Sequence, residues 1–156
     1  MTWLGIDLGR RRIGLALSDG SATLARPWKS VPAGPTADAS IDAILIEVRR
    51  LARETLDEAG VDGFVVGLPR RLGGEDNAQT PIARHVAARL AERTGLTVHL
   101  QDERLTSREA EARLAERERD WRKRKPLIDA VAAAIILQDF LDAAGGPSVP
   151  APAHGL

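Results

Sequence analysis

Short apolar runs alternate with longer amphipathic stretches along most of the chain. The first run covers residues 2–9 and is too short for a helix, so it predicts a buried strand. Side chains in a strand alternate between its faces, which places Leu4, Ile6 and Leu8 on one face. Asp7 then lies on the other face, with a glycine two positions away on each side. If it is buried, such a carboxylate needs a cation, a metal ion or several hydrogen-bond donors.

The apolar run over residues 13–18 follows a basic turn closely enough to form an antiparallel hairpin with the first strand. A weaker third strand over residues 23–31 contains Pro27, which places it near a sheet edge. Helical and strand patterns then alternate over residues 36–59, 64–69, 80–95, 97–101, 106–118 and 127–143. This order predicts an α/β fold with a five-stranded mixed sheet flanked by helices, in which three antiparallel strands precede the parallel ones.

The helix over residues 80–95 should have Pro81 in its first turn and a glycine at its end. Its buried side should contain Ile82, Val86 and Leu90, which recur at helical spacing.

Residues 1–144 carry all of these elements and predict one domain, whereas the Pro- and Ala-rich segment 145–156 is expected to be disordered. The chain of 156 residues contains no cysteine, which excludes disulfides and thiolate metal sites and favours the cytoplasm. Because no apolar run is long enough to span a bilayer, we expect no membrane partner.

Two acidic residues stand out for their place in this pattern. Asp7 ends the first strand, and Glu103 directly follows the fifth, where functional sites of α/β sheets gather. Asp102 competes with Glu103 for this role. By alternation, however, Asp102 continues the apolar face of its strand, so it should serve as a turn or cap residue.

Asp129 lies in the first turn of the last helix. The residues three, four, seven and eight positions later are Ala132, Ala133, Ile136 and Leu137, so Asp129 heads an apolar stripe. An aspartate that only complements the helix dipole is the alternative, and taken alone it would be preferred. Together with Asp7 and Glu103, however, Asp129 would complete an all-oxygen site suited to Mg²⁺ or Mn²⁺, which could support phosphodiester cleavage.

The 22 basic and 22 acidic side chains cancel, but the basic ones are clustered. The candidate nucleic-acid contacts are Arg10, Arg11, Arg12, Arg70, Arg71, Trp121, Arg122, Lys123, Arg124 and Lys125. The turn at residues 10–12 could equally be solvated, and Trp121 could either stack on a base or cap an apolar patch. Gly67 and the pair Gly73-Gly74 most simply serve turns, and no nucleophile–base arrangement is recognisable.

Several blocks of the sequence resemble the YqgF/RuvX family of small bacterial proteins with an RNase-H-like fold. The resemblance runs from Gly5 to about Leu141 and departs mildly at Arg70-Arg71. The blocks that carry it are Gly5–Gly9, Ile13–Ala16, Val66–Pro69, Gly73-Gly74, Asp102–Thr106 and Asp129–Leu137. The resemblance implies that Asp7, Glu103 and Asp129 are the metal-binding, catalytic acids.

The resemblance also implies a nuclease that matures the 5′ end of precursor 16S ribosomal RNA or, as an alternative, resolves four-way DNA junctions. Symmetric resolution of a junction needs two active sites and therefore a homodimer, whereas RNA processing allows a monomer. A non-catalytic nucleic-acid-binding module of the same fold is the rival from another class. Actin-like or sugar-kinase-like ATPases duplicate a similar domain, and this chain is too short for that arrangement.

Overall fold

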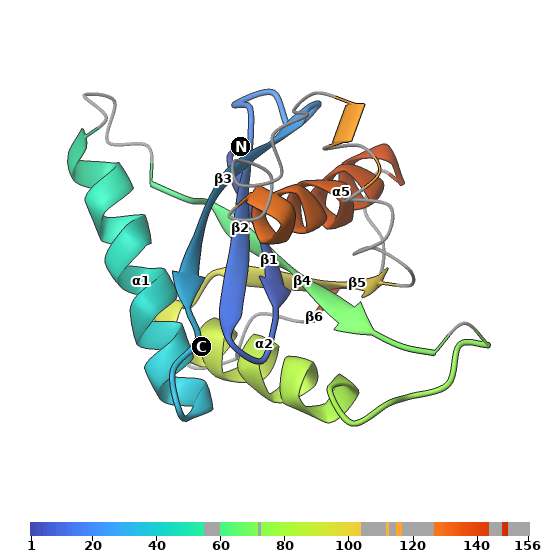
Figure 1. Ribbon diagram of the computed structural model, residues 1–156. Helices are drawn as coiled ribbons and strands as arrows, with labels where there is room; N and C mark the ends of the chain where they lie inside the picture. Colours follow the sequence, from blue (N-terminus) through green and yellow to red (C-terminus); the bar gives the residue numbers. More distant parts are fainter. Residues whose placement is uncertain are drawn as a thin grey trace.

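The computed structural model describes residues 1–54, 60–71, 73–103, 112, 115–116, 127–143 and 148–149. The core of the structure is a mixed sheet with helices on both faces (Figure 1). In sheet order the strands are β3 (Ala25–Pro32), β2 (Arg12–Ser18), β1 (Trp3–Leu8), β4 (Gly63–Pro69), β5 (Thr97–Glu103) and β6 (Ser148–Val149).

β1 lies at the centre of the sheet. It pairs antiparallel with β2 and parallel with β4, and β4 in turn pairs parallel with β5. The predicted mixed α/β sheet is therefore confirmed, with β3 at the edge that Pro27 indicated. All five predicted strands are present, and the short strand β6 adds antiparallel to β5 with Ser148 opposite His99. The segment expected to be disordered thus contains a two-residue strand, and its other residues lie outside the described part of the chain.

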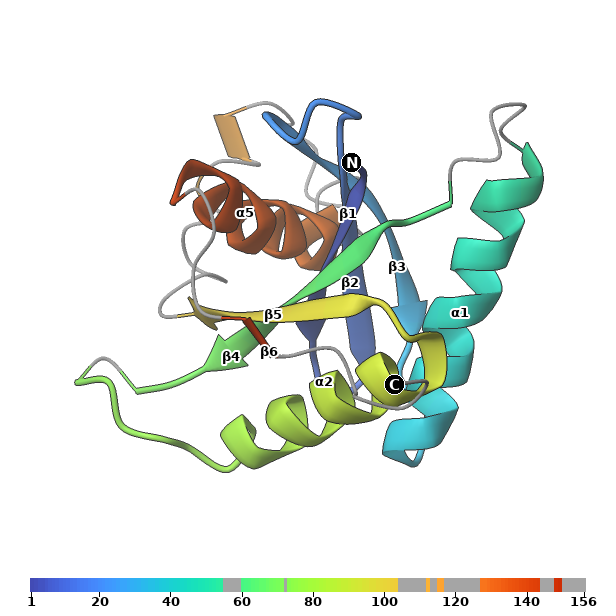
Figure 2. The same ribbon diagram turned by 180° about the vertical axis from the view of Figure 1, so that it is seen from behind.

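Of the three helices that the structure describes from end to end, two cover one face of the sheet and one covers the other (Figures 1 and 2). α1 (Ala37–Glu54) and α2 (Thr80–Thr94) share the first face, and α5 (Ile128–Asp142) lies on the second. The helix predicted over residues 106–118 is described only at residues 112, 115 and 116, which are helical. No helix in the described ranges is long and apolar enough to cross a membrane.

Strand alternation divides the core into two clusters. Leu4 and Ile6 of β1 are fully buried among apolar side chains of α1 and α2. Trp3 and Val65 point to the opposite face, where they pack with Phe140 and other residues of α5. Asp7 shares the α5 face by the same alternation, as the sequence predicted.

The start of α2 is fixed at the end of β4. The buried Thr80 hydroxyl donates a hydrogen bond to the Pro69 carbonyl. Proline in the first turn and a left-handed glycine at the end of α2 agree with the sequence prediction. The predicted buried side was wrong at Ile82, which is 47% exposed, because this part of α2 borders an open cavity instead of the core.

Candidate functional site

The end of β1 brings Asp7 beneath the first turns of α5. Asp7 is paired with Gly14 of the neighbouring β2, and both positions face the helix. A β-carbon at Gly14 would overlap the backbone carbonyl of Asp129. The glycine therefore lets the start of α5 touch the sheet, because only a residue without a side chain leaves room for that approach. This contact brings Asp129 close to the carboxyl end of β1, where Asp7 lies.

Glu103 reaches the same place from the end of β5. A β-carbon at Gly67 of β4 would lie 2.7 Å from the Glu103 Oε2 atom and 2.6 Å from the Ile136 Cδ1 atom. Gly67 is thus a mid-strand residue that makes room for Glu103, and its prediction as a turn glycine was wrong. Asp102 lies on the other face, where its carboxylate is 3.4 Å from the Arg70 Nε atom. The alternation argument that separated these two acids agrees with this placement.

A side-chain hydrogen bond joins Asp7 and Glu103, so one of these two carboxyl groups carries a proton. Burial, opposed by this bond and reinforced by the charge of Asp129, raises the pKa of Asp7 from 3.8 to about 6. Burial and the adjacent Asp7 raise the pKa of Glu103 from 4.5 to about 9, so the pair retains a proton near neutral pH. The two carboxyl groups thus share one proton, and a bound cation would displace it.

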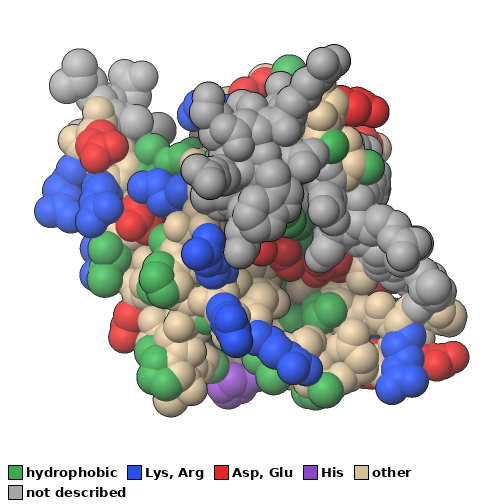
Figure 3. All heavy atoms as spheres, viewed as in Figure 1, with side chains coloured by type: hydrophobic (Ala, Val, Ile, Leu, Met, Phe, Trp, Pro, Cys, Tyr) green, Lys and Arg blue, Asp and Glu red, His purple; other side chains and the backbone are tan. Residues whose placement is uncertain are grey.

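Asp129 lies between the acidic pair and the basic turn. Burial raises its pKa, and the charge of Arg12 opposes that shift. Asp129 and the turn line a hollow of about 430 Å³, together with Ile128 at the start of α5. Acidic side chains gather near the middle of the face in Figure 3, close to the first turn of α5, with basic side chains beside them. The hollow therefore places arginine residues of the turn next to the acids.

The three acids are the candidate ligands of a divalent cation. All of their ligating atoms are carboxylate oxygens, which Mg²⁺ and Mn²⁺ prefer. Two of the three groups are already in hydrogen-bond contact, and the third acts on Asp7 electrostatically. In the conformation described for residues 1–54, 60–71, 73–103 and 127–143, no three acidic or histidine side chains are close enough to cage an ion. Small movements of the carboxylates would thus accompany cation binding.

The predicted basic contacts separate into three groups. Arg10, Arg11 and Arg12 are exposed and line the hollow beside Asp129. Arg70 is engaged with acids instead, because its Nε atom lies 3.7 Å from Asp76 and 3.4 Å from Asp102. Arg71 is exposed in the loop after β4. The residues from Trp121 to Lys125 lie outside the described part of the chain.

Sequence reasoning missed the supporting roles of Gly14 and Gly67. A glycine inside a strand often marks a close approach by another part of the chain. Gly14 is also the hairpin partner of Asp7, which could have been read from the hairpin register. What approaches each glycine depends on how α5 lies across the sheet, and the sequence pattern does not contain that information.

The raised carboxyl pKa values predict how the stability of the metal-free protein depends on pH. A group whose pKa is higher in the folded than in the unfolded chain stabilises the fold below its unfolded pKa, and this contribution is lost as pH rises through its folded pKa. With unfolded values of 3.8 and 4.5 and folded values of about 6 and about 9, the free energy of unfolding should fall between about pH 4 and about pH 9. Asp7 alone accounts for on the order of 3 kcal/mol.

Urea unfolding in the presence of a chelator, repeated across this pH range, measures how steeply the free energy of unfolding falls with pH. The Asp7→Asn protein should show a flatter slope than the parent, because it lacks one of the two interacting carboxyls. Equal slopes in the two proteins would contradict the assigned interaction between Asp7 and Glu103.

Known proteins resemble this chain in sequence and in fold. A family model described as "RuvX: Holliday junction resolvase" matches residues 1–143. A protein of Anaeromyxobacter sp. (strain Fw109-5) named "Putative pre-16S rRNA nuclease" is 44% identical over 91% of this chain and 97% of its own length. A protein of the same name from Chloroflexus aggregans (strain MD-66 / DSM 9485) is 41% identical over 94% of this chain and 96% of its own length.

Solved structures support the fold. The structure of Thermus thermophilus RuvC matches with a TM-score of 0.54 at 16% identity, covering 96% of this chain and 100% of that one. T. thermophilus RuvC in complex with a Holliday junction substrate matches with a TM-score of 0.53 at 15% identity. At these identities the likeness concerns the fold alone, and it confirms the RNase-H-like architecture expected from the sequence.

Proposed function

Because the chain belongs to the RuvX family, we propose that it is a divalent-metal-dependent endonuclease that processes the 5′ end of precursor 16S ribosomal RNA in the cytoplasm. The family establishes the coarser statement that the protein is a nuclease, which hydrolyses phosphodiester bonds in nucleic acid. The observation that carries the proposal is the meeting of Asp7, Glu103 and Asp129 at one edge of the sheet, beside a basic hollow.

In this proposal the three acids would hold one or two Mg²⁺ or Mn²⁺ ions. When bound, the metal would activate a water molecule and stabilise the leaving oxygen of the phosphodiester. The chain itself contributes position and charge. Arg10, Arg11 and Arg12 would hold the substrate phosphates beside Asp129, and Arg12 also keeps Asp129 more acidic than its burial alone would allow.

The proton shared by Asp7 and Glu103 must leave before both groups can act as ligands. Burial raises the pKa of both groups, so the pair holds this proton in the absence of a cation. Both side chains are partly exposed, so solvent can take up the proton. Cation binding therefore competes with protonation of the Asp7–Glu103 pair, and a lower pH should weaken cation binding.

The names of the relatives favour the RNA substrate, because both proteins above are named for precursor 16S rRNA. The family description favours the alternative, resolution of Holliday junctions by a homodimer. A non-catalytic binding module would be marked by the loss of one acid, and all three acids are present here.

A side-by-side cleavage assay tests these functions. The full chain is incubated with precursor 16S RNA and with a synthetic four-way DNA junction, each with Mg²⁺ or Mn²⁺. We expect the RNA to be cleaved near its mature 5′ end and the junction to stay intact. Paired symmetric cuts in the junction with intact RNA would replace the proposal by the resolvase function. Binding of either substrate without cleavage under both metals would overturn catalysis.

A further inference from the structure

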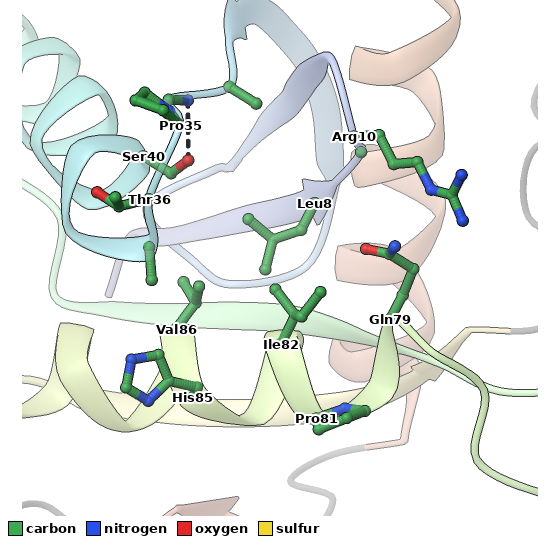
Figure 4. Close-up of a pocket in the computed structure, with 14 residues that line it drawn as sticks. Leu8, Arg10, Pro35, Thr36, Ser40, Gln79, Pro81, Ile82, His85 and Val86 are labelled. Carbon is green, nitrogen blue, oxygen red and sulfur yellow. Dashed lines mark hydrogen bonds between the residues drawn. The ribbon is translucent and has the colours of Figure 1, made fainter.

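A second cavity lies at the same end of the molecule, on the opposite face of the sheet. It has a volume of about 570 Å³ and opens between the starts of α1 and α2 and the end of β1 (Figure 4). Leu8 of β1 points toward Ile82 and Val86 of α2 across this space, and Pro35 borders it from the loop before α1. We call this cavity the interhelical pocket.

The walls of the interhelical pocket are mainly apolar, and a few polar side chains lie among them on different sides. Ile82 contributes exposed apolar surface, although the periodicity of α2 predicted it to be buried. Gln79 reaches into the cavity from the start of α2, and its side chain makes no hydrogen bond that would cap the helix. A volume within the range of about 300–1,000 Å³, apolar walls and a few converging polar groups are typical of ligand sites.

The pocket adjoins the basic hollow of the proposed active site. Gly9 and Arg10 line both cavities, so the turn between β1 and β2 separates the pocket from the acids. Leu8, a wall of the pocket, directly follows Asp7 in β1, and their side chains point to opposite faces of the sheet. A nucleic-acid strand held at the acids would therefore pass the mouth of the pocket when it crosses this turn.

We propose that the interhelical pocket receives one unpaired nucleobase of the nucleic-acid substrate, next to the phosphodiester that is cleaved. This inference rests on the proposed nuclease function and adds a base-binding subsite to it. An extruded base is held between apolar or aromatic side chains and is read by hydrogen bonds to its edge. Leu8, Ile82 and Pro35 supply the apolar contacts, and the Gln79 amide supplies both a donor and an acceptor.

The charges around the pocket favour a base over a phosphate or an acidic peptide. Arg10 is the one lysine or arginine among the lining residues, and it lies on the wall that faces the active-site hollow. The other phosphate-binding candidates, Arg11 and Arg12, line only that hollow. The backbone of a bound strand would thus follow the arginines, while a neighbouring base turns into the apolar space.

The test places a single abasic site at successive positions around the cleaved bond of precursor 16S RNA. Binding is measured with full-chain Asp7→Asn protein in Mg²⁺, so that cleavage does not interfere. We expect one position at which loss of the base weakens binding about tenfold. In the same protein carrying Ile82→Trp, which fills the pocket, the intact RNA should bind about tenfold more weakly and the abasic position should have no further effect.

Ile46→Trp is the matched control, because Ile46 is 49% exposed on α1 and does not line the pocket. It should preserve the tenfold effect of the abasic site. A 2-aminopurine base at the sensitive position should also gain fluorescence on binding, and Ile82→Trp should remove that gain.

The inference is overturned if no abasic position matters, or if the abasic effect persists unchanged in Ile82→Trp. Binding of an apolar peptide in the pocket without any base dependence would also overturn it. These outcomes differ from a failure of the proposed function, which is a lack of cleavage by the parent protein whatever the binding data show.

Discussion

Replacing Asp7 by Asn is expected to abolish cleavage in Mg²⁺ or Mn²⁺ while leaving the fold intact. Asparagine keeps the size of the side chain but removes the negative charge that a cation needs at the centre of the site. It also removes the charge at position 7 that contributes to the raised pKa of Glu103. We expect a loss of about a thousandfold in the rate of cleavage.

Asp102→Asn provides the matched control, because it is the same substitution on the other face of β5. Its carboxylate pairs with Arg70 and does not face the other acids, so cleavage should stay within about twofold of the parent. Circular dichroism and thermal unfolding check that both variants are folded. Full activity of the Asp7→Asn protein would refute the assignment of the site, as would an equal loss in Asp102→Asn.

The second large effect is expected from Gly14→Ala. The added β-carbon would overlap the backbone carbonyl of Asp129, and a backbone atom cannot rotate away as a side chain can. The start of α5 must therefore move off the sheet and carry Asp129 with it. We expect unfolding to be easier by about 2–3 kcal/mol, a melting temperature lower by about 5–10 °C and cleavage slower by about a hundredfold.

Gly20→Ala adds the same methyl group where no atom lies within 4 Å and where the backbone is not left-handed. It should change neither the melting temperature nor the cleavage rate appreciably. Thermal unfolding and the cleavage assay measure both variants. If Gly14→Ala behaves like Gly20→Ala, the close contact between β2 and α5 does not hold the site together.

The candidate site was predictable from the sequence to the extent that it depends on local periodicity. Strand alternation separates Asp7 from the apolar side of β1, and it separates Glu103 from Asp102 at the end of β5. Helical spacing places Asp129 at the head of the apolar stripe of α5. These are rules of single elements, and they hold here because each element is long enough to show its period.

The parts that were missed depend on contacts between distant elements. Gly67 looks like a turn residue in the sequence, but Ile136 and Glu103 converge on it in the fold. Ile82 fits the apolar stripe of α2, yet it borders an open pocket because the start of α1 and the end of β1 do not cover it. The strand β6 has only two residues, too few to show any periodicity.

The most direct test of a metal site shared by Asp7, Glu103 and Asp129 is isothermal titration of Mn²⁺ into the protein. The titration is done near neutral pH in two buffers that differ in ionisation enthalpy. The account predicts that Mn²⁺ binds with release of a proton from the Asp7–Glu103 pair, and that Asp7→Asn loses both the binding and the proton release. Equal binding by the parent and Asp7→Asn proteins, or binding by the parent without release of a proton, would contradict it.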